Sequence, residues 1–146
     1  MNTNRISVLI KTASLEFDKM SNPILSEYEL TTSQCRVLRF LYSQPNNSAR
    51  VVDIEKECSI THPTVLGLLN ILEKKGFIFR TVNPDDARSK LISLTEKAIE
   101  MQTELENVVE EIDEILTENL SMEERKQLSE LLKKLLREEV SDNQSI

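Results

Sequence analysis

The stretch FIFRTVNPDDARSKLISLT, from Phe77 to Thr95, contains the most informative pattern in this chain. Two segments rich in apolar and β-branched residues flank the polar segment NPDDARSK, in which Pro84 and Asp85 favour a turn. This pattern predicts a β-hairpin. The other segments have helical periodicity, so we expect a single hairpin in a chain that is otherwise helical.

The two segments before the hairpin are predicted to be helices joined by a tight turn. VVDIEKEC, from Val51 to Cys58, spaces its apolar residues by three and four. The next segment, HPTVLGLLNILEKKG, has Thr61 as its expected N-cap and Gly76 as its expected left-handed C-cap. A short helix, a turn, a second helix and a hairpin form a winged helix-turn-helix. Its second helix can lie in a DNA major groove, with the hairpin as the wing.

Further helices are expected on both sides of this lobe. Thr31 with Gln34, and Ser121 with Glu124, have the spacing of capping boxes, and Thr95 is an expected cap. Pro23 predicts a break within the first helical segment. The helix after Thr95 repeats apolar residues over nearly three heptads, which favours packing against a partner helix. The predicted fold class is mainly α with a small β-hairpin.

Composition excludes several classes of protein. The 146 residues fit one domain, or one compact core with a helical annex. Cys35 and Cys58 are too few for a disulfide framework, and His62 is the only histidine, so no zinc cluster and no other cofactor is expected. No apolar run approaches the ~18 residues of a membrane span, and a cytoplasmic protein is expected. The sequence contains no glycine-rich phosphate loop and no catalytic cluster, so an enzyme is not expected.

The charge is distributed unevenly along the chain. The net charge of −7 argues against nucleic acid when it is taken alone. Residues 31–95, however, carry nine basic and six acidic residues, a net +3, whereas residues 96–146 carry six basic and fifteen acidic residues, a net −9. The asymmetry indicates two roles on one chain, although acidic helices can simply be solvated.

The outward face of the predicted second helix holds the first candidate DNA contacts. They are Thr64, Gly67, Asn70 and Lys74, with Thr61 and His62 at the helix start. Asparagine can form a bidentate pair with adenine, and threonine can contact a base edge or a thymine methyl group. The helix amides favour a phosphate, and Gly67 permits close approach of the backbone. The alternative is that this polar face only faces water, and His62 is then an ordinary polar residue of a first turn.

The wing holds the second group of candidates. Arg88 is placed to enter a narrow minor groove, where the negative potential is enhanced. Asp86 is expected to hold the Arg88 side chain by a charge-assisted hydrogen bond, which explains why acid and base stand together. Arg80, Ser89 and Lys90 are expected phosphate contacts. The alternative is a solvated turn. Outside these groups, Cys35 and Cys58 are expected as small core residues rather than redox sensors.

The chain resembles the MarR family of bacterial transcriptional regulators. The resemblance lies in LTTSQCRVLRFL, SITHPTVLGLLNILEKKGFI and NPDDARSKLISLT, and above all in Asp86 and Arg88 of the wing with the closing LT. It extends over roughly the whole chain, because the flanking helices fit the family's order. It implies a winged helix-turn-helix at residues 31–95, flanked by dimerisation helices at 1–30 and 96–146.

The resemblance also implies partners. It implies a homodimer that binds a pseudo-palindromic operator in double-stranded DNA, and repression relieved by a small, often aromatic or phenolic ligand. Oxidant sensing by a cysteine in the first helix is not expected, because no cysteine precedes Cys35. One departure stands out: many members carry an arginine on the outward face of the second helix, near the position where this chain has Gly67. Base-specific affinity is then expected to rest more on DNA shape and on the wing.

A second class of function competes with DNA binding. A winged helix can serve as a protein–protein module, such as an antirepressor, and hold a partner with the same helix. The net charge of −7 and Leu66, expected to be exposed beside Gly67, favour this alternative.

Overall fold

The structure is a computed structural model that describes residues 4–137. The chain divides into two compact units, Met1–Val109 and Glu110–Ile146, with the boundary inside one helix. The α-helices are α1 (Ile6–Leu25), α2 (Thr32–Tyr42), α3 (Val51–Cys58), α4 (His62–Lys74), α5 (Glu96–Glu100), α6 (Gln102–Leu116) and α7 (Met122–Leu135). The strands are β1 (Ser48–Arg50), β2 (Ile78–Asn83) and β3 (Asp86–Leu94), and two short 3₁₀ helices lie at Ser26–Tyr28 and Pro45–Asn47.

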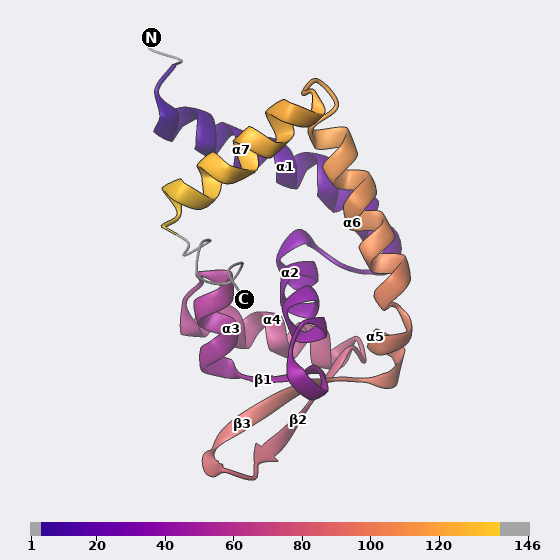
Figure 1. Ribbon diagram of the computed structural model, residues 1–146. Helices are drawn as coiled ribbons and strands as arrows, with labels where there is room; N and C mark the ends of the chain where they lie inside the picture. The colour runs from indigo at the N-terminus through magenta and orange to yellow at the C-terminus, as the bar shows by residue number, and fades with distance from the viewer. Residues whose placement is uncertain (1–3, 138–146) are drawn as a thin grey trace. The chain divides into compact units, whose positions relative to one another are not determined.

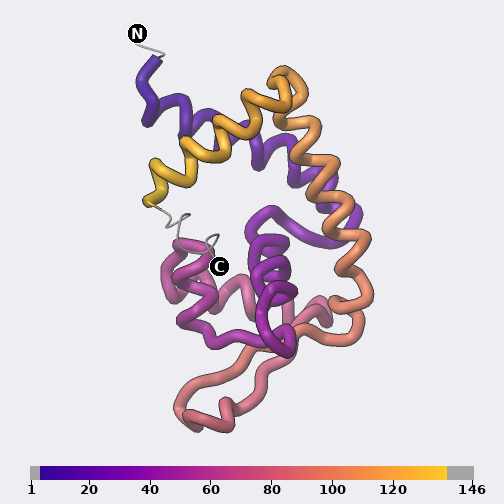
Figure 2. Tube along the Cα trace, viewed as in Figure 1, coloured from indigo at the N-terminus to yellow at the C-terminus, as the bar shows by residue number. Residues whose placement is uncertain are grey.

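The first unit contains the expected winged helix-turn-helix. Figure 1 shows α2, α3 and α4 grouped together, with β2 and β3 extending away from them as a two-stranded ribbon. The trace in Figure 2 follows the same ribbon as a finger-like loop. The mainly helical fold class and the hairpin are therefore confirmed.

The sheet has one strand more than the sequence predicted. β1 pairs antiparallel with β3, so the strand order is β1-β3-β2. Ala49 stands opposite Ile92, and the hydroxyls of Ser48 and Ser93 lie 2.6 Å apart. Three residues with one buried alanine carry too weak a pattern to predict a strand. The added strand fixes the base of the wing directly before α3.

The predicted helix starts are confirmed. Thr31 and Gln34 form a capping box, as do Ser121 and Glu124. Thr95 Oγ1 accepts from the amide of Ala98 at 3.3 Å and donates to the carbonyl of Gly76 at 2.6 Å. Such caps satisfy amides that have no partner within the helix.

The break predicted at Pro23 is wrong. α1 continues through Pro23 and ends at Leu25. The proline removes one amide donor only two residues before Leu25, the last residue of the helix. Asn22 is instead an anchor, because its Oδ1 accepts from the amide of Thr32 at the start of α2.

The core of the first unit lies where α2, α3, α4 and the sheet meet. Its side chains of zero exposure include Val37, Leu38, Leu41, Ile54, Val65, Leu69, Leu72 and Ile92. Cys35 and Cys58 are buried among the core residues, as expected. Burial raises the pKa of Cys35 to about 11 and also raises that of Cys58, because a thiolate is poorly solvated there.

The long helix expected after Thr95 is divided at Met101 into α5 and α6. The contacts that hold this segment to the lobe include a hydrogen bond, a cation–π contact and an ion pair. The Tyr42 hydroxyl donates to the carbonyl of Ala98 at 2.5 Å, and burial raises the pKa of Tyr42 to about 12. The Lys97 ammonium lies 4.5 Å from the centroid of the Phe77 ring. Arg39 forms an ion pair with Glu106 at 3.0 Å.

Two helices, α1 and α7, each expose several apolar side chains. In the first unit, the exposed apolar residues of α1 are Ile6, Val8, Leu9, Ile10 and Leu15. In the second unit α7 has no buried residue, and its exposed apolar residues are Met122, Leu128, Leu131, Leu132 and Leu135. Within that unit, Arg125 braces the turn before α7 through an ion pair of 3.0 Å with Glu114.

Candidate nucleic-acid interface

α4 is fixed to the lobe by one apolar face. Val65, Leu69 and Leu72 are completely buried along that face. Ser59, in the left-handed conformation with φ 53°, ends α3 and turns the chain toward α4. Because the buried stripe fixes the rotation of the helix, the identity of its exposed face is also fixed.

The exposed face of α4 carries the predicted residues and one that the sequence did not single out. Thr64, Gly67, Asn70 and Lys74 are all exposed. Ile71 lies on the same face, one turn after Gly67, and its side chain is 43% exposed. In the sequence Ile71 continues the apolar run around Leu69, and only its spacing of seven from Thr64 places it on the outward face.

Gly67 is helical and has free space around it. A Cβ added there would meet no atom within 4 Å, so no neighbour in the structure requires a glycine. Glycine inside a helix costs about 1 kcal/mol relative to alanine. Glycine at this position therefore does not stabilise the fold. It does allow another surface to approach the helix backbone closely.

The start of α4 differs in detail from the prediction. Thr61 is the N-cap residue, but its side chain accepts no amide bond, and its hydroxyl lies 2.9 Å from that of Thr64. His62 Nδ1 instead contacts Glu55 Oε1 of α3, across the helix-turn-helix. The first-turn amides of α4 therefore have no side-chain cap, and an unpaired helix N-terminus favours an anion such as phosphate.

A buried asparagine organises the wing tip. Asn83, only 8% exposed, accepts from the amide of Asp85 at 3.0 Å and donates to Ser89 Oγ at 3.1 Å. Ser89 Oγ donates in turn to the carbonyl of Asp86 at 3.2 Å. No role beyond the turn was predicted for Asn83, because its burial depends on how the two strands close.

Asp86 holds Arg88 mainly through the backbone. Its Oδ1 accepts from the amide of Arg88 at 3.0 Å and lies 3.6 Å from the guanidinium Nε, which is an ion pair but not a hydrogen bond. The Arg88 side chain is 95% exposed. The expected hydrogen bond to the guanidinium is thus replaced by one that shapes the turn, and the guanidinium extends into solvent.

Arg80 turns toward α4. Its Nη2 donates to Asn70 Oδ1 at 2.5 Å, and its Nε lies 3.6 Å from Glu73 Oε1. The side chain is only 27% exposed. Arg80 therefore connects β2 to the exposed face of α4. This contact was not part of its predicted role, which was to bind a phosphate.

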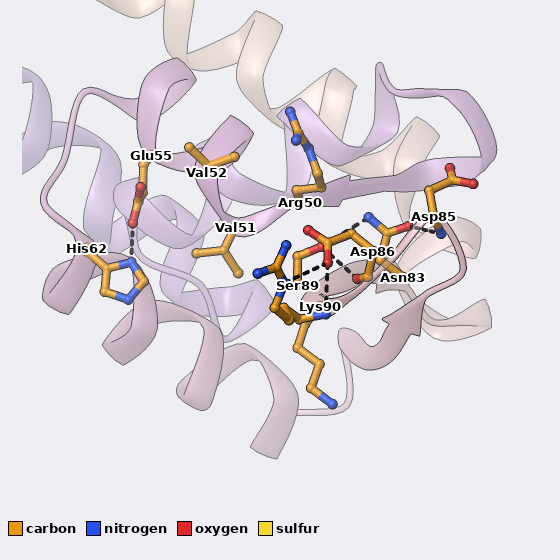
Figure 3. Close-up of a pocket in the computed structure, with 11 residues that line it drawn as sticks. Arg50, Val51, Val52, Glu55, His62, Asn83, Asp85, Asp86, Ser89 and Lys90 are labelled. Atoms are coloured by element: carbon orange, nitrogen blue, oxygen red, sulfur yellow. Dashed lines mark hydrogen bonds and ion pairs between the residues drawn. The ribbon is translucent and has the colours of Figure 1, made fainter.

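A cleft of about 610 Å³ lies between α3, the first residue of α4 and the wing. Figure 3 shows His62 with Glu55 at one end, Asn83 and Asp85 at the other, and Val51 between them. Asp86, Arg88, Ser89 and Lys90 also line the cleft, together with Arg50 and Val52. The structure thus brings His62 and the wing candidates to one concave surface, while Thr64, Gly67, Asn70 and Lys74 do not line it.

The cations near this surface are not equivalent. Arg50 forms a two-pronged pair with Asp53, with both N–O distances at 3.0 Å. The hydrogen bond from Arg50 lowers the pKa of the Asp53 carboxyl, and the same bond raises the pKa of Arg50. Lys74 and Lys90 have no ion pair within the part of the chain that the structure describes. These two lysines and the exposed Arg88 are therefore the side chains best placed to meet phosphates.

Two features are absent from residues 4–137. No group of three or more His, Cys, Asp or Glu side chains is arranged to hold a metal ion. No helix in this range is both long and apolar enough to cross a membrane.

Comparison with known proteins gives consistent matches. A family model described as MarR family matches residues 28–89. The S. aureus MepR–DNA complex is 32% identical with a TM-score of 0.81, and the match covers 91% of this chain and 97% of that one. A cysteine-to-serine variant of E. coli MarR in complex with operator DNA is 28% identical with a TM-score of 0.82, covering 90% and 93%.

A third structure matches in fold alone. Bordetella bronchiseptica BpsR, whose DNA binding is regulated by 6-hydroxynicotinic acid, is 24% identical with a TM-score of 0.84. That match covers 92% of this chain and 95% of BpsR. In all three matches the similarity extends beyond the winged helix into the flanking helices, since about nine-tenths of this chain is covered.

Proposed function

The chain belongs to the MarR family of DNA-binding transcriptional regulators, and from this premise we propose that it is a homodimeric, sequence-specific repressor of a pseudo-palindromic operator. One observation carries the proposal. The exposed face of α4 and the exposed Arg88 of the wing belong to one compact unit, in which Arg80 of β2 contacts α4. A helix and a ribbon held in this way suit adjacent major and minor grooves.

Each candidate residue has a proposed role. Thr64, Gly67 and Asn70 face base edges, and the uncapped start of α4 with Thr61 and His62 faces a phosphate. Arg88 enters the minor groove, while Lys74, Ser89 and Lys90 contact the backbone. Asp86 shapes the wing turn through the Arg88 amide. Arg80 is assigned to orienting α4, because its guanidinium is engaged by Asn70 and Glu73.

The dimer is supported by the apolar faces of α1 and α7. Leu131 of α7 is 63% exposed and Ile6 of α1 is 64% exposed. α7 has no buried residue, and an amphipathic helix of that kind needs a partner to cover its apolar stripe. We assign residues 1–30 and 96–146 to dimerisation. Two lobes related by a twofold axis then address half-sites about one DNA turn apart.

Relief of repression by a small aromatic or phenolic ligand belongs to the proposal as well. This part of the proposal rests on the family resemblance. The proposed regulator uses no cofactor and is located in the cytoplasm. The competing role as a protein–protein module has weakened, because Leu66 is half-buried rather than exposed. The net charge of −7 still favours that role.

Selection of bound DNA from a random-sequence pool tests the proposal. The full chain is incubated with the pool at low salt, and the recovered DNA is sequenced over several rounds. We expect an inverted repeat with half-site centres ~10 base pairs apart. A pool without an enriched inverted repeat, even at low salt, would refute the proposed function.

A further inference from the structure

The outward face of α4 has little charge for a helix that reads DNA. Thr64, Gly67 and Ile71 follow one another at spacings of three and four, and no arginine or lysine precedes Lys74 on the helix. The contact most often used for specific recognition is a bidentate arginine or lysine on guanine. Over its first three turns α4 therefore has no side chain for that contact.

This strip instead offers an apolar surface with a recess. Ile71 exposes 43% of its side chain, and one turn earlier Gly67 leaves the space around its missing Cβ empty. Residues four apart on a helix are neighbours, so the recess lies beside the isoleucine. The hydroxyl of Thr64 is hydrogen-bonded to that of Thr61, so the methyl group is the part of the Thr64 side chain that remains for another contact. In the major groove the C5-methyl of thymine is the group that makes such apolar contacts.

Beside this strip stands an amide whose orientation is fixed. Arg80 Nη2 lies 2.5 Å from the side-chain oxygen of Asn70. A guanidinium has only donors, so the oxygen end of the amide must face Arg80, and the NH₂ end is the one left for another partner. Glu73 lies 3.6 Å from Arg80 Nε and helps to hold the guanidinium in place. Arg80 occupies one lone pair of the Asn70 oxygen and turns the NH₂ donors outward, whereas pairing with adenine N6 and N7 requires the oxygen and the NH₂ to face the base together.

A donor next to an apolar recess matches one base. Thymine alone shows a methyl group and an acceptor, O4, side by side in the major groove, whereas cytosine shows an amino donor at that position. Resting on the proposed function, we propose that α4 reads thymine. Ile71 and the recess at Gly67 receive the C5-methyl, Asn70 donates to O4, and Arg80 is the positioning residue that sets this preference.

Base analogues in the selected operator separate the two contacts. Replacing thymine by uracil removes only the methyl group. For each thymine that α4 contacts, we expect the affinity of the wild-type chain to fall about three- to fivefold, which corresponds to one buried methyl. Ile71→Ala should bind the two operators equally. Because Ile71 is exposed, this variant keeps the fold, and thermal unfolding checks that it does.

The second analogue is 5-methylcytosine paired with guanine, which keeps the methyl group but replaces O4 by an amino donor. The wild-type chain should bind this operator about tenfold or more weakly than the thymine operator. Arg80→Met frees the amide to turn, so the preference for thymine over 5-methylcytosine should shrink. In Arg80→Lys a donor remains, and the preference should persist. A purely structural role of Arg80 would lower both affinities without changing their ratio.

Asn70→Asp provides a test that does not depend on Arg80 variants folding. A carboxylate at position 70 can still pair with Arg80 but has no donor, so the preference should reverse in favour of 5-methylcytosine. Equal wild-type affinity for all three operators, or an unchanged ratio in Asn70→Asp, would overturn the thymine assignment while leaving DNA binding intact. Failure of the wild-type chain to select any operator would instead refute the proposed function.

Discussion

Arg80 and Asn70 join the two parts of the DNA-binding lobe, since the guanidinium of strand β2 donates to the side-chain oxygen of helix α4 at 2.5 Å. The wing therefore does not depend on the chain connection alone for its position relative to the helix. A rigid pair of this kind keeps two groove contacts in register, so less conformational entropy is lost when DNA binds.

Removing the wing cation should weaken DNA binding without changing the fold. Arg88 is 95% exposed, so Arg88→Ala should leave thermal unfolding and the oligomeric state unchanged. Operator affinity should fall about tenfold or more, and the salt dependence should lose about one unit of slope per contact. Fluorescence anisotropy over a salt series measures both quantities. Lys126→Ala in α7 removes the same charge from a helix that is not part of the winged helix-turn-helix, and an equal loss there would contradict a specific role for Arg88.

Gly67 should reveal a conflict between stability and binding. Gly67→Ala should raise the free energy of unfolding by about 1 kcal/mol, because alanine favours helix and its Cβ meets no atom within 4 Å. The same methyl group fills the recess on α4, so operator affinity should fall. Urea unfolding and anisotropy titration check the two effects. An alanine variant that is both more stable and equally tight in binding would show that α4 does not approach DNA closely at this position.

Stability should decline at alkaline pH because of Cys35. Burial raises its pKa from 9.0 to about 11. Below pH 9 the thiol is protonated in both the folded and the unfolded chain, so it causes no loss in the free energy of unfolding. Between pH 9 and 11 only the unfolded chain loses the proton, so the free energy of unfolding falls, by up to about 3 kcal/mol. Urea unfolding of wild type and Cys35→Ala across this range should give a flatter curve for the variant, and parallel curves would contradict the assignment.

Leu131 tests the proposed dimer. Its side chain is 63% exposed, so Leu131→Glu costs the isolated fold little. If α7 packs against a partner subunit, the charge should lower the molar mass in analytical ultracentrifugation and abolish operator binding. Glu130→Gln, at the neighbouring exposed position, should preserve both. A dimer that persists in Leu131→Glu would exclude α7 from the subunit interface.

The sequence was sufficient to predict the elements that depend on local chemistry. The capping box of Thr31, the left-handed Gly76 with φ 81° and the hairpin after it were all read from residue type and spacing. The helix through Pro23 was missed because local propensity predicts a break there, whereas tertiary contacts such as the bond from Thr32 to Asn22 hold the segment.

The side-chain network of the interface could be predicted only in part. The outward positions on α4 follow from helical periodicity, except that Ile71 was hidden within an apolar run. The Arg80–Asn70 and His62–Glu55 contacts join residues on different elements, and their partners depend on how those elements pack. No spacing rule in a single sequence encodes such pairs.

Directed cleavage from the wing tip tests most directly the claim that α4 and the wing address one duplex. Ala87→Cys places a thiol at the exposed tip, and an iron chelate attached there cleaves nearby DNA, while Cys35 and Cys58 are buried and protected from labelling. We expect two minor-groove cleavage sites related by a dyad, one at each outer flank of the inverted repeat. Cleavage absent from the flanks, or confined to the major groove at the half-site centres, would contradict that claim.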